Sequence, residues 1–363
     1  MHGVVAGVAV ALLLAGCARS MQEAGAAQGV ELPTSDPAVT KTRAVAGEQH
    51  QTRGGRWLSG ASGPLAANGT FGAWRKAPLG IGGDWENDND AQVTMSSVCP
   101  GGQWGRWNKP LDLAVGAIEK RKGESWAKAA RGAYDARWRR SWLRLKQCWG
   151  TRDPAYLYVR FAHEMNLGSM QWSVAAGEEA DFVAAIKRFS DLRYEIMPRA
   201  SLVLCPSDGT DGDLKLDVRT LWPGRDAKGR LVANLYAVDT YNGYVVVRNG
   251  GEFVTKATRL DDRGWLFGIE THRAFAESLG VPFAVSEWSN NGDPQDAGRG
   301  GEAPDYVRLM NDYFREHAGD PAHPKAGQLL YEIQFNILRQ FTLLPTKLQP
   351  ETAAAYRSLA WGR

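Results

Sequence analysis

Two stretches of this sequence run from an apolar strand directly into a glutamate. Residues 156–166 read Tyr-Leu-Tyr-Val-Arg-Phe-Ala-His-Glu-Met-Asn, and residues 281–288 read Val-Pro-Phe-Ala-Val-Ser-Glu-Trp. Their aromatic and branched residues favour buried strands. Ligands and catalytic groups collect at the carboxyl ends of parallel strands, so Glu164 and Glu287 are predicted to lie at one rim of a sheet. Two carboxyl groups in such a position are typical of glycosidic bond hydrolysis.

Strand and helix patterns alternate along most of the chain, which indicates an α/β protein with a parallel sheet. The predicted strands are 78–85, 91–98, 111–118, 156–161, 200–205, 231–240, 281–287 and 329–335. The predicted helices are 125–146, 182–193, 273–279 and 306–316. An open doubly wound sheet is the alternative, but the sequence has neither a phosphate loop nor a dinucleotide fingerprint. We therefore expect a (β/α)8 TIM barrel.

The two glutamate motifs resemble those of glycoside hydrolase family 26, which contains β-mannanases and related β-glycanases. Residues 160–166, Arg-Phe-Ala-His-Glu-Met-Asn, are similar to its acid/base strand, and Ser286-Glu287-Trp288 is similar to its nucleophile strand. The resemblance implies a barrel with Glu164 as acid/base after the fourth strand and Glu287 as nucleophile on the seventh. A βα unit takes roughly 30 residues, more with long loops, and the interval between the glutamates fits three such units.

Further site residues are expected around the two glutamates. Tyr241 is predicted to donate a hydrogen bond to Glu287, and Arg160 to pair with a buried carboxylate. The candidate substrate-binding residues are His163, Asn166, Trp172, Tyr241, Trp288, Asp84 and Trp85. The segments 167–172 and 205–207 depart from the family pattern, which leaves the identity of the substrate open.

The first residues read as an export signal. Residues 4–16 are almost entirely apolar, and Leu14-Ala15-Gly16-Cys17 matches a bacterial lipobox. The run is too short for a membrane span of about 20 residues and suits a secretory signal. Residues 1–17 are thus predicted to be a lipoprotein signal peptide with Cys17 lipidated; a plain signal peptide with an incidental cysteine is the alternative.

A lipidated Cys17 implies that the protein is attached to a membrane by its N-terminus. Ala18 follows this cysteine, where an aspartate would favour the inner membrane, so we expect an outer-membrane lipoprotein that faces the periplasm or the cell surface. A periplasmic or secreted protein is the alternative. Residues 18–62 are rich in small and polar residues and are predicted to form a disordered linker. Residues 63–363 are predicted to form the catalytic barrel.

Composition and cysteine content limit the partners and cofactors. The formal charge of +3 gives no reason to expect nucleic acid binding, and a monomer is expected. His163-Glu164 begins like a zinc motif, but Leu167 stands where the second histidine is needed, so we predict no metal and no cofactor. Cys99, Cys148 and Cys205 allow one disulfide and one thiol. Cys99 and Cys205 are expected beyond strand carboxyl ends and Cys148 at the opposite face, and the pairing is open.

Two functions of different classes fit these features. The first is a retaining endo-β-glycosidase, similar to family 26, that hydrolyses a β-linked polysaccharide such as mannan, β-glucan or bacterial exopolysaccharide. The second is a catalytically weak barrel that binds polysaccharide in exopolysaccharide assembly or export. Scavenging of external glycans and processing of the cell's own polysaccharide are both open.

Overall fold

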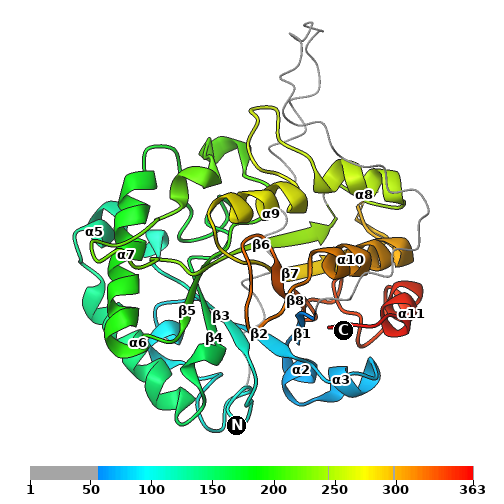
Figure 1. The fold of residues 1–363 in the computed structure, drawn as a ribbon, viewed down its shortest axis with the longest axis horizontal. Coiled ribbons are helices and arrows are strands. Elements are labelled where there is room, and N and C mark those ends of the chain that lie inside the picture. Colours follow the sequence, from blue (N-terminus) through cyan, green and yellow to red (C-terminus); the bar gives the residue numbers. More distant parts are fainter. Residues whose placement is uncertain (1–55, 244, 297–298, 363) are drawn as a thin grey trace, which may run out of the picture. The chain divides into compact units, whose positions relative to one another are not determined.

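The computed structural model describes residues 56–243, 245–296 and 299–362, and its strands form a closed barrel in sequence order (Figure 1). Every pair of neighbouring strands is parallel, and β1 closes the barrel against β8. The strands are β1 (Leu58–Ser62), β2 (Ile81–Glu86), β3 (Leu111–Val115), β4 (Leu157–Phe161), β5 (Ser201–Leu204), β6 (Leu235–Asn242), β7 (Phe283–Asn290) and β8 (Leu329–Gln334). The predicted (β/α)8 barrel is confirmed.

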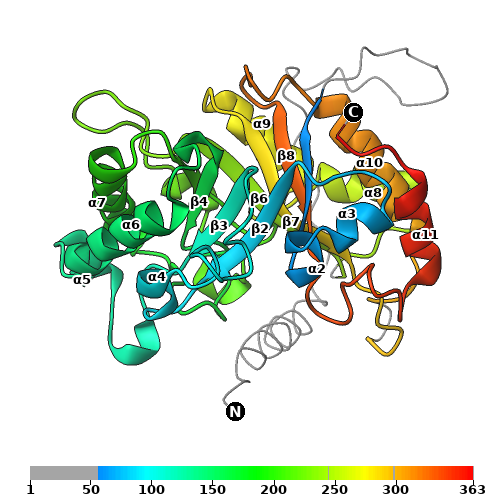
Figure 2. The same ribbon diagram turned by 90° about the horizontal axis from the view of Figure 1, so that it is seen from below.

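Helices surround the strands, and Figure 2 shows α5, α6 and α7 on one side of the barrel and α10 and α11 on the other. The helices are α2 (Pro64–Ala67), α3 (Thr70–Trp74), α4 (Ala91–Thr94), α5 (Trp126–Ala130), α6 (Asp135–Trp149), α7 (Glu179–Ile196), α8 (Gly250–Ala257), α9 (Ile269–Ser278), α10 (Pro304–His317) and α11 (Pro350–Ser358). Between β5 and β6 the chain forms only the 3₁₀ turns η3 (Gly212–Leu214) and η4 (Val218–Leu221). Two further 3₁₀ turns are η1 (Lys120–Lys122) and η2 (Pro154–Tyr156).

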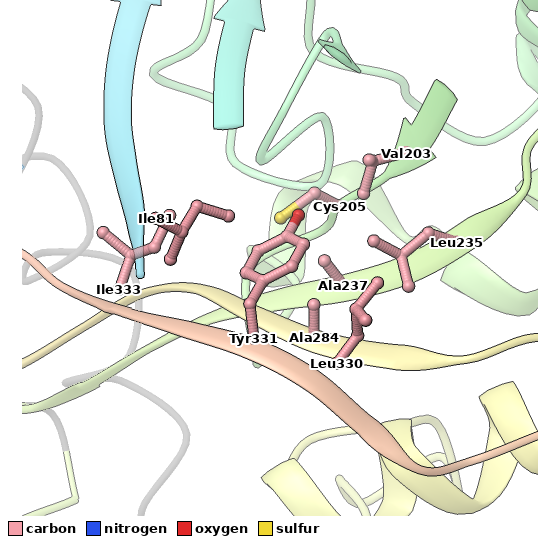
Figure 3. Packing of buried hydrophobic residues seen from close by; sticks show 9 residues of the cluster. All are labelled: Ile81, Val203, Cys205, Leu235, Ala237, Ala284, Leu330, Tyr331 and Ile333. Atoms are coloured by element: carbon pink, nitrogen blue, oxygen red, sulfur yellow. The ribbon is translucent and has the colours of Figure 1, made fainter. Parts of the chain in front are cut away.

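Inward-facing side chains fill the barrel, as in other barrels of this kind, so it is a packed core rather than a pore (Figure 3). The phenol ring of Tyr331 lies among them, and alanines on β6 and β7 leave room for it. The buried cluster consists of Ile81, Val203, Cys205, Leu235, Ala237, Ala284, Leu330, Tyr331 and Ile333. This apolar core supports the polar groups that follow at the carboxyl ends of the strands.

The first strand lies where the sequence predicted linker. β1 occupies Leu58–Ser62, so the domain boundary at residue 63 is wrong, and the glycine-rich strand predicted first is β2. β1 consists mostly of Ser, Gly and Ala, which have little strand preference. Tertiary contacts compensate: β1 pairs with both β2 and β8, and the Trp57 indole donates to Glu332 at 3.4 Å.

Two other predictions are corrected by local backbone chemistry. The strand predicted at 91–98 is helix α4 followed by turns, since the Asp88 carboxylate accepts from the amides of Asp90 and Ala91 and starts a helical turn. The single helix predicted over 125–146 is divided into α5 and α6. Gly132 separates them with φ of 87°, a left-handed conformation that ends helices. The other predicted helices correspond to α7, α9 and α10.

A disulfide joins Cys99 to Cys148, and Cys205 is a buried thiol. The expected placement of Cys99 and Cys148 at opposite faces is therefore wrong. The disulfide joins the segment that follows β2 to the last turn of α6. Arg152 links the same two segments, because its guanidinium donates to the carbonyls of Val98 at 3.0 Å and Cys148 at 2.7 Å.

Candidate active site

The Glu287 carboxylate is held by three hydrogen-bond donors. It lies on β7 and is almost completely buried, and both of its oxygens accept hydrogen bonds. Oε1 accepts from Trp85 Nε1 and from Arg160 Nη1, both at 2.8 Å. Oε2 accepts from the Tyr241 hydroxyl at 2.6 Å, which confirms the predicted contact. Three donors around an acceptor-only group suit an ionised carboxylate and fix its orientation.

Arg160 connects Glu287 to two buried aspartates, Asp112 and Asp239. Its side chain is 0% exposed and it forms ion pairs with Asp112, Asp239 and Glu287, so the predicted pairing with a buried carboxylate is confirmed. The same nitrogen, Nη1, donates to Asp239 at 3.1 Å and to Glu287. Burial of a charge is costly unless it is paired and hydrogen-bonded, and these three carboxylates provide the pairing.

Further hydrogen bonds hold the Asp112 and Asp239 carboxylates in place. Asp112 Oδ2 accepts from Ser286 Oγ at 2.6 Å and from Tyr331 Oη at 2.7 Å. The buried thiol of Cys205 donates to Asp239 at 3.3 Å. Residues from β3, β6, β7 and β8 thereby converge on Arg160 of β4. The sequence identified Arg160 but not these partners, because they are distant in sequence.

Glu164 lies just beyond β4, and its carboxyl group differs from that of Glu287. It is half-buried, and its backbone has φ of 51°, as does Ala162. Non-glycine residues rarely adopt this left-handed conformation, and they cluster at functional sites when they do. The Glu164 amide donates to the Cys205 carbonyl at 2.8 Å, which attaches the turn to β5.

The environment of Glu164 favours its protonated form. Burial, and then the negative charge of Glu287, raise its pKa to about 8, although the Arg160 cation opposes them. Asp208 and Asp211 add smaller repulsions. The two glutamates therefore interact electrostatically, and one holds a proton near neutral pH while the other accepts three hydrogen bonds. Such a division of roles between two carboxyl groups is what acid catalysis combined with nucleophilic attack requires.

Aromatic side chains form one wall beside Glu287. Phe335 packs against Trp85 and Tyr241, with ring centroids 5.4 and 5.7 Å apart. Phe341 contacts Tyr241 at 4.9 Å and Phe335 at 5.8 Å. Neither phenylalanine was predicted from the sequence to lie at the site. The position of Phe335 directly after an apolar strand was the available signal, whereas nothing local marks Phe341.

A buried lysine holds the backbone of Tyr241. The Lys256 ammonium group, on α8, donates to the Tyr241 carbonyl, and Asp208 interacts with it electrostatically. Asp208 in turn accepts a hydrogen bond from Thr240 Oγ1 at 2.5 Å. These residues connect the segments that follow β5 and β6, and sequence patterns did not reveal them.

Three predicted site residues lie close to Glu164, but their side chains make their contacts within the protein. The His163 ring is buried, and burial followed by the Arg160 charge holds its pKa well below its ordinary value. The Trp172 indole is buried against this ring and donates to the His163 carbonyl at 2.6 Å. Asn166 accepts from the Ser207 amide and donates to the Ser207 and Gly209 carbonyls, so both ends of its amide are occupied.

These contacts make the three residues supports of the turn that presents Glu164. The polar atoms of Asn166 are used within the protein. Sugar contacts by Asn166, His163 and Trp172 stay predictions.

Asp84 and Trp288 face away from the site. Trp85 points toward Glu287, so its neighbour Asp84 faces the outside of the barrel. Burial raises the pKa of Asp84 to about 6, although hydrogen bonds from Ser97 and Trp104 oppose this shift. Trp288 is 0% exposed and packs against Tyr306, Phe314 and Trp361. The predicted sugar contacts of Asp84 and Trp288 are wrong because successive strand residues point to opposite faces.

Replacing Trp288 with phenylalanine is expected to lower the free energy of unfolding by about 3 kcal/mol. The Trp288 indole donates to Glu332 at 2.6 Å, so the variant loses buried volume and leaves a buried carboxylate oxygen without this donor. Urea unfolding followed by circular dichroism would measure the change. A variant as stable as the parent would contradict the assignment of Trp288 to the core.

Comparisons with known proteins bear on the fold. No protein-family model matches the sequence, and no curated protein matches it. One similar solved structure is the family 26 modular endo-β-1,4-mannanase of Cellulomonas fimi, with 11% identity, coverage of 83% of this chain and 70% of that chain, and a TM-score of 0.48. Another is the family 26 β-mannanase of Bacteroides ovatus, with 13% identity, coverage of 84% and 88%, and a TM-score of 0.47.

A third similar structure is an exo-β-1,4-mannosidase from Opitutaceae bacterium strain TAV5, with 10% identity, coverage of 84% of this chain and 59% of that chain, and a TM-score of 0.51. At such identities the likeness concerns the fold alone. Within the described residues, no helix is long and apolar enough to span a membrane. The same residues contain no cluster of three or more His, Cys, Asp or Glu side chains suited to a metal ion.

Proposed function

We propose that this protein is a retaining endo-β-glycosidase, similar to family 26, with Glu287 as nucleophile and Glu164 as general acid/base. The observation that carries the proposal is the contrast between the two glutamates. Glu287 accepts hydrogen bonds from Trp85, Arg160 and Tyr241, whereas the pKa of Glu164 is raised to about 8 by burial and by the charge of Glu287. One carboxylate ready to attack and one acid ready to donate are the two groups that double displacement needs.

In the first step, Glu164 gives its proton to the glycosidic oxygen while a Glu287 oxygen attacks the anomeric carbon. The bond from this carbon to the leaving oxygen breaks, and an ester to Glu287 forms. In the second step, Glu164 takes a proton from water, the water oxygen attacks the anomeric carbon, and the ester breaks. The hydrogen bonds to Glu287 orient its carboxylate for the attack.

The same electrostatic coupling helps Glu164 to change role between the steps. The negative charge of Glu287 raises the pKa of Glu164 in the free enzyme. Esterification removes that charge, so the pKa of Glu164 falls when the residue must act as a base. Asp208 and Asp211 keep a smaller repulsion throughout.

The substrate proposed is a β-linked polysaccharide such as mannan, β-glucan or bacterial exopolysaccharide. The half-buried rings of Trp85 and Tyr241, with Phe335 and Phe341 packed against them, support a sugar substrate, because aromatic rings offer faces on which the C–H groups of a sugar ring pack. We also propose a lipid anchor at Cys17, which lies outside the described residues. Metabolic lipid labelling of the full chain tests it: a Cys17→Ala variant that keeps the label would refute the anchor.

Reducing-sugar release by the full chain tests the proposed activity. The substrates are mannan, glucomannan, mixed-linkage glucan, xylan and the exopolysaccharide of the source organism. Release from one polymer, with early products of intermediate length, would support endo-hydrolysis and define the substrate class. No release from any of these polymers by a folded protein would contradict the proposal and favour polysaccharide binding without turnover.

The rate is expected to fall on the alkaline side with the pKa of Glu164. Because this pKa is raised to about 8, the acid form predominates below pH 8 and is lost above it. kcat/KM should therefore decrease about tenfold per pH unit above about pH 8. Initial rates between pH 6 and 10, with far-ultraviolet circular dichroism at each pH to exclude unfolding, would measure the profile. A fall already complete by about pH 6 would contradict the assignment of Glu164 as acid.

A further inference from the structure

A pocket lies at the other end of β2 from the candidate active site. It has a volume of about 380 Å³. One side is formed by the segment that contains α2 and α3 (Figures 1 and 2), and the other by the segment that precedes β3. Its lining residues are Ala66, Gly69, Gly72, Ala73, Lys76, Ala77, Pro78, Leu79, Trp107 and Lys109. Leu79 precedes β2, whereas Trp85, which contacts Glu287, lies near the carboxyl end of that strand. The pocket is therefore separate from the candidate active site.

Trp107 offers its ring to this pocket. Its indole N–H already donates to the Pro110 carbonyl at 2.8 Å, so its polar group is satisfied within the protein. The Trp104 ring meets it edge-on, with centroids 5.0 Å apart and an interplanar angle of 89°. The half-buried Trp107 ring is thus held rigidly, and its contribution to the pocket is apolar.

Two lysines accompany this ring. Lys109 Nζ lies 5.5 Å from the Trp107 ring centroid and donates to the Leu79 carbonyl at 2.8 Å. An ammonium group has three donors, so two remain for a ligand. Lys76 is exposed, and its φ of 59° is in the left-handed region that a lysine rarely adopts. A lysine therefore lines the pocket at a position whose backbone conformation favours glycine.

We propose that this pocket binds a carboxylated sugar unit of an acidic polysaccharide. The apolar ring of Trp107 would pack on the C–H face of the sugar, and Lys76 and Lys109 would pair with its carboxylate. None of the ten lining residues is acidic, so nothing in the lining opposes a bound anion. The site would hold the polymer on the protein surface and raise its effective concentration at the proposed active site. This inference does not require the polymer to be hydrolysed.

The test measures binding to the full chain that carries Glu287→Gln, so that cleavage cannot consume the ligand. The probes are β-1,4-linked mannuronate oligomers and neutral β-1,4-manno-oligosaccharides, titrated calorimetrically. We expect tighter binding of the acidic oligomers, weakened about tenfold or more by Lys76→Glu. Lys146→Glu is the matched control, because it makes the same charge change at an exposed lysine on α6 and should leave affinity unchanged.

Two further variants separate binding from folding. Lys76→Gly relieves the left-handed backbone, so it should weaken binding while the thermal midpoint stays equal or rises. Ala73→Trp, on the exposed side of α3, should fill the pocket and weaken binding with both lysines present.

Equal affinity of Lys76→Glu and Lys146→Glu would overturn the proposal. So would equal affinity for neutral and acidic oligomers, or binding of inorganic polyphosphate as tight as that of the oligomers. Since binding is measured in an inactive variant, the pocket and the proposed hydrolysis can fail independently.

Discussion

Glu287→Ala is expected to lower kcat on the cleaved polysaccharide by at least about 10⁴-fold, because loss of a nucleophile removes the covalent route. The fold should survive, since Arg160 keeps its ion pairs with Asp112 and Asp239. Initial rates on the polymer identified by reducing-sugar release would measure the loss. Trp288→Phe, at the next residue of β7, is the matched control, because it should lower stability and leave kcat close to that of the parent.

Azide makes this experiment diagnostic of the mechanism. In Glu287→Ala the small anion can occupy the space of the missing carboxylate and attack the anomeric carbon while Glu164 still protonates the leaving oxygen. A β-linked substrate should then yield an α-glycosyl azide, detectable by nuclear magnetic resonance. Undiminished turnover in Glu287→Ala would refute its role as nucleophile, and a β-glycosyl azide from this variant would contradict the proposed geometry of attack.

Sequence patterns predicted the structure best for apolar strands that run directly into charged residues. β3 to β8 were recognised because they contain long apolar or branched runs, and Glu164 and Glu287 because polar residues follow such runs directly. β1 was missed because its Leu-Ser-Gly-Ala-Ser sequence has almost no intrinsic strand preference. Its pairing with β2 and β8 is a tertiary effect that no local pattern contains.

The site shows the same division between local and tertiary information. The hydrogen bond from Tyr241 to Glu287 and the burial of Arg160 among carboxylates were predicted from strand positions, and both are present. Trp288 was misassigned because its proximity to Glu287 in sequence was given more weight than the alternation of strand residues. Phe341 lies in the loop after β8 and Lys256 on helix α8. Their positions at the site depend on the whole fold, so no sequence signal identified them.

Glu164→Ala should have a large effect that depends on the leaving group. General acid catalysis contributes about 10²- to 10⁴-fold, and we expect a loss in this range on the natural polysaccharide, whose leaving alcohol needs a proton. A dinitrophenyl glycoside of the same sugar needs little protonation, so its first step should be almost unaffected. Comparison of kcat/KM for the two substrates would measure the difference, and equal losses on both would contradict the role of Glu164 as acid.

The pH profile and azide provide independent readouts in the same variant. Because Glu164 is the group whose pKa is raised to about 8, its removal should abolish the alkaline decrease in kcat/KM on the natural polysaccharide. Azide can then replace water in the second step without base assistance, and it should give a β-glycosyl azide with Glu287 in place. Opposite anomers from Glu164→Ala and Glu287→Ala would assign the two roles from chemistry alone. The same anomer from both variants would show that the two carboxylates do not act as the proposed pair.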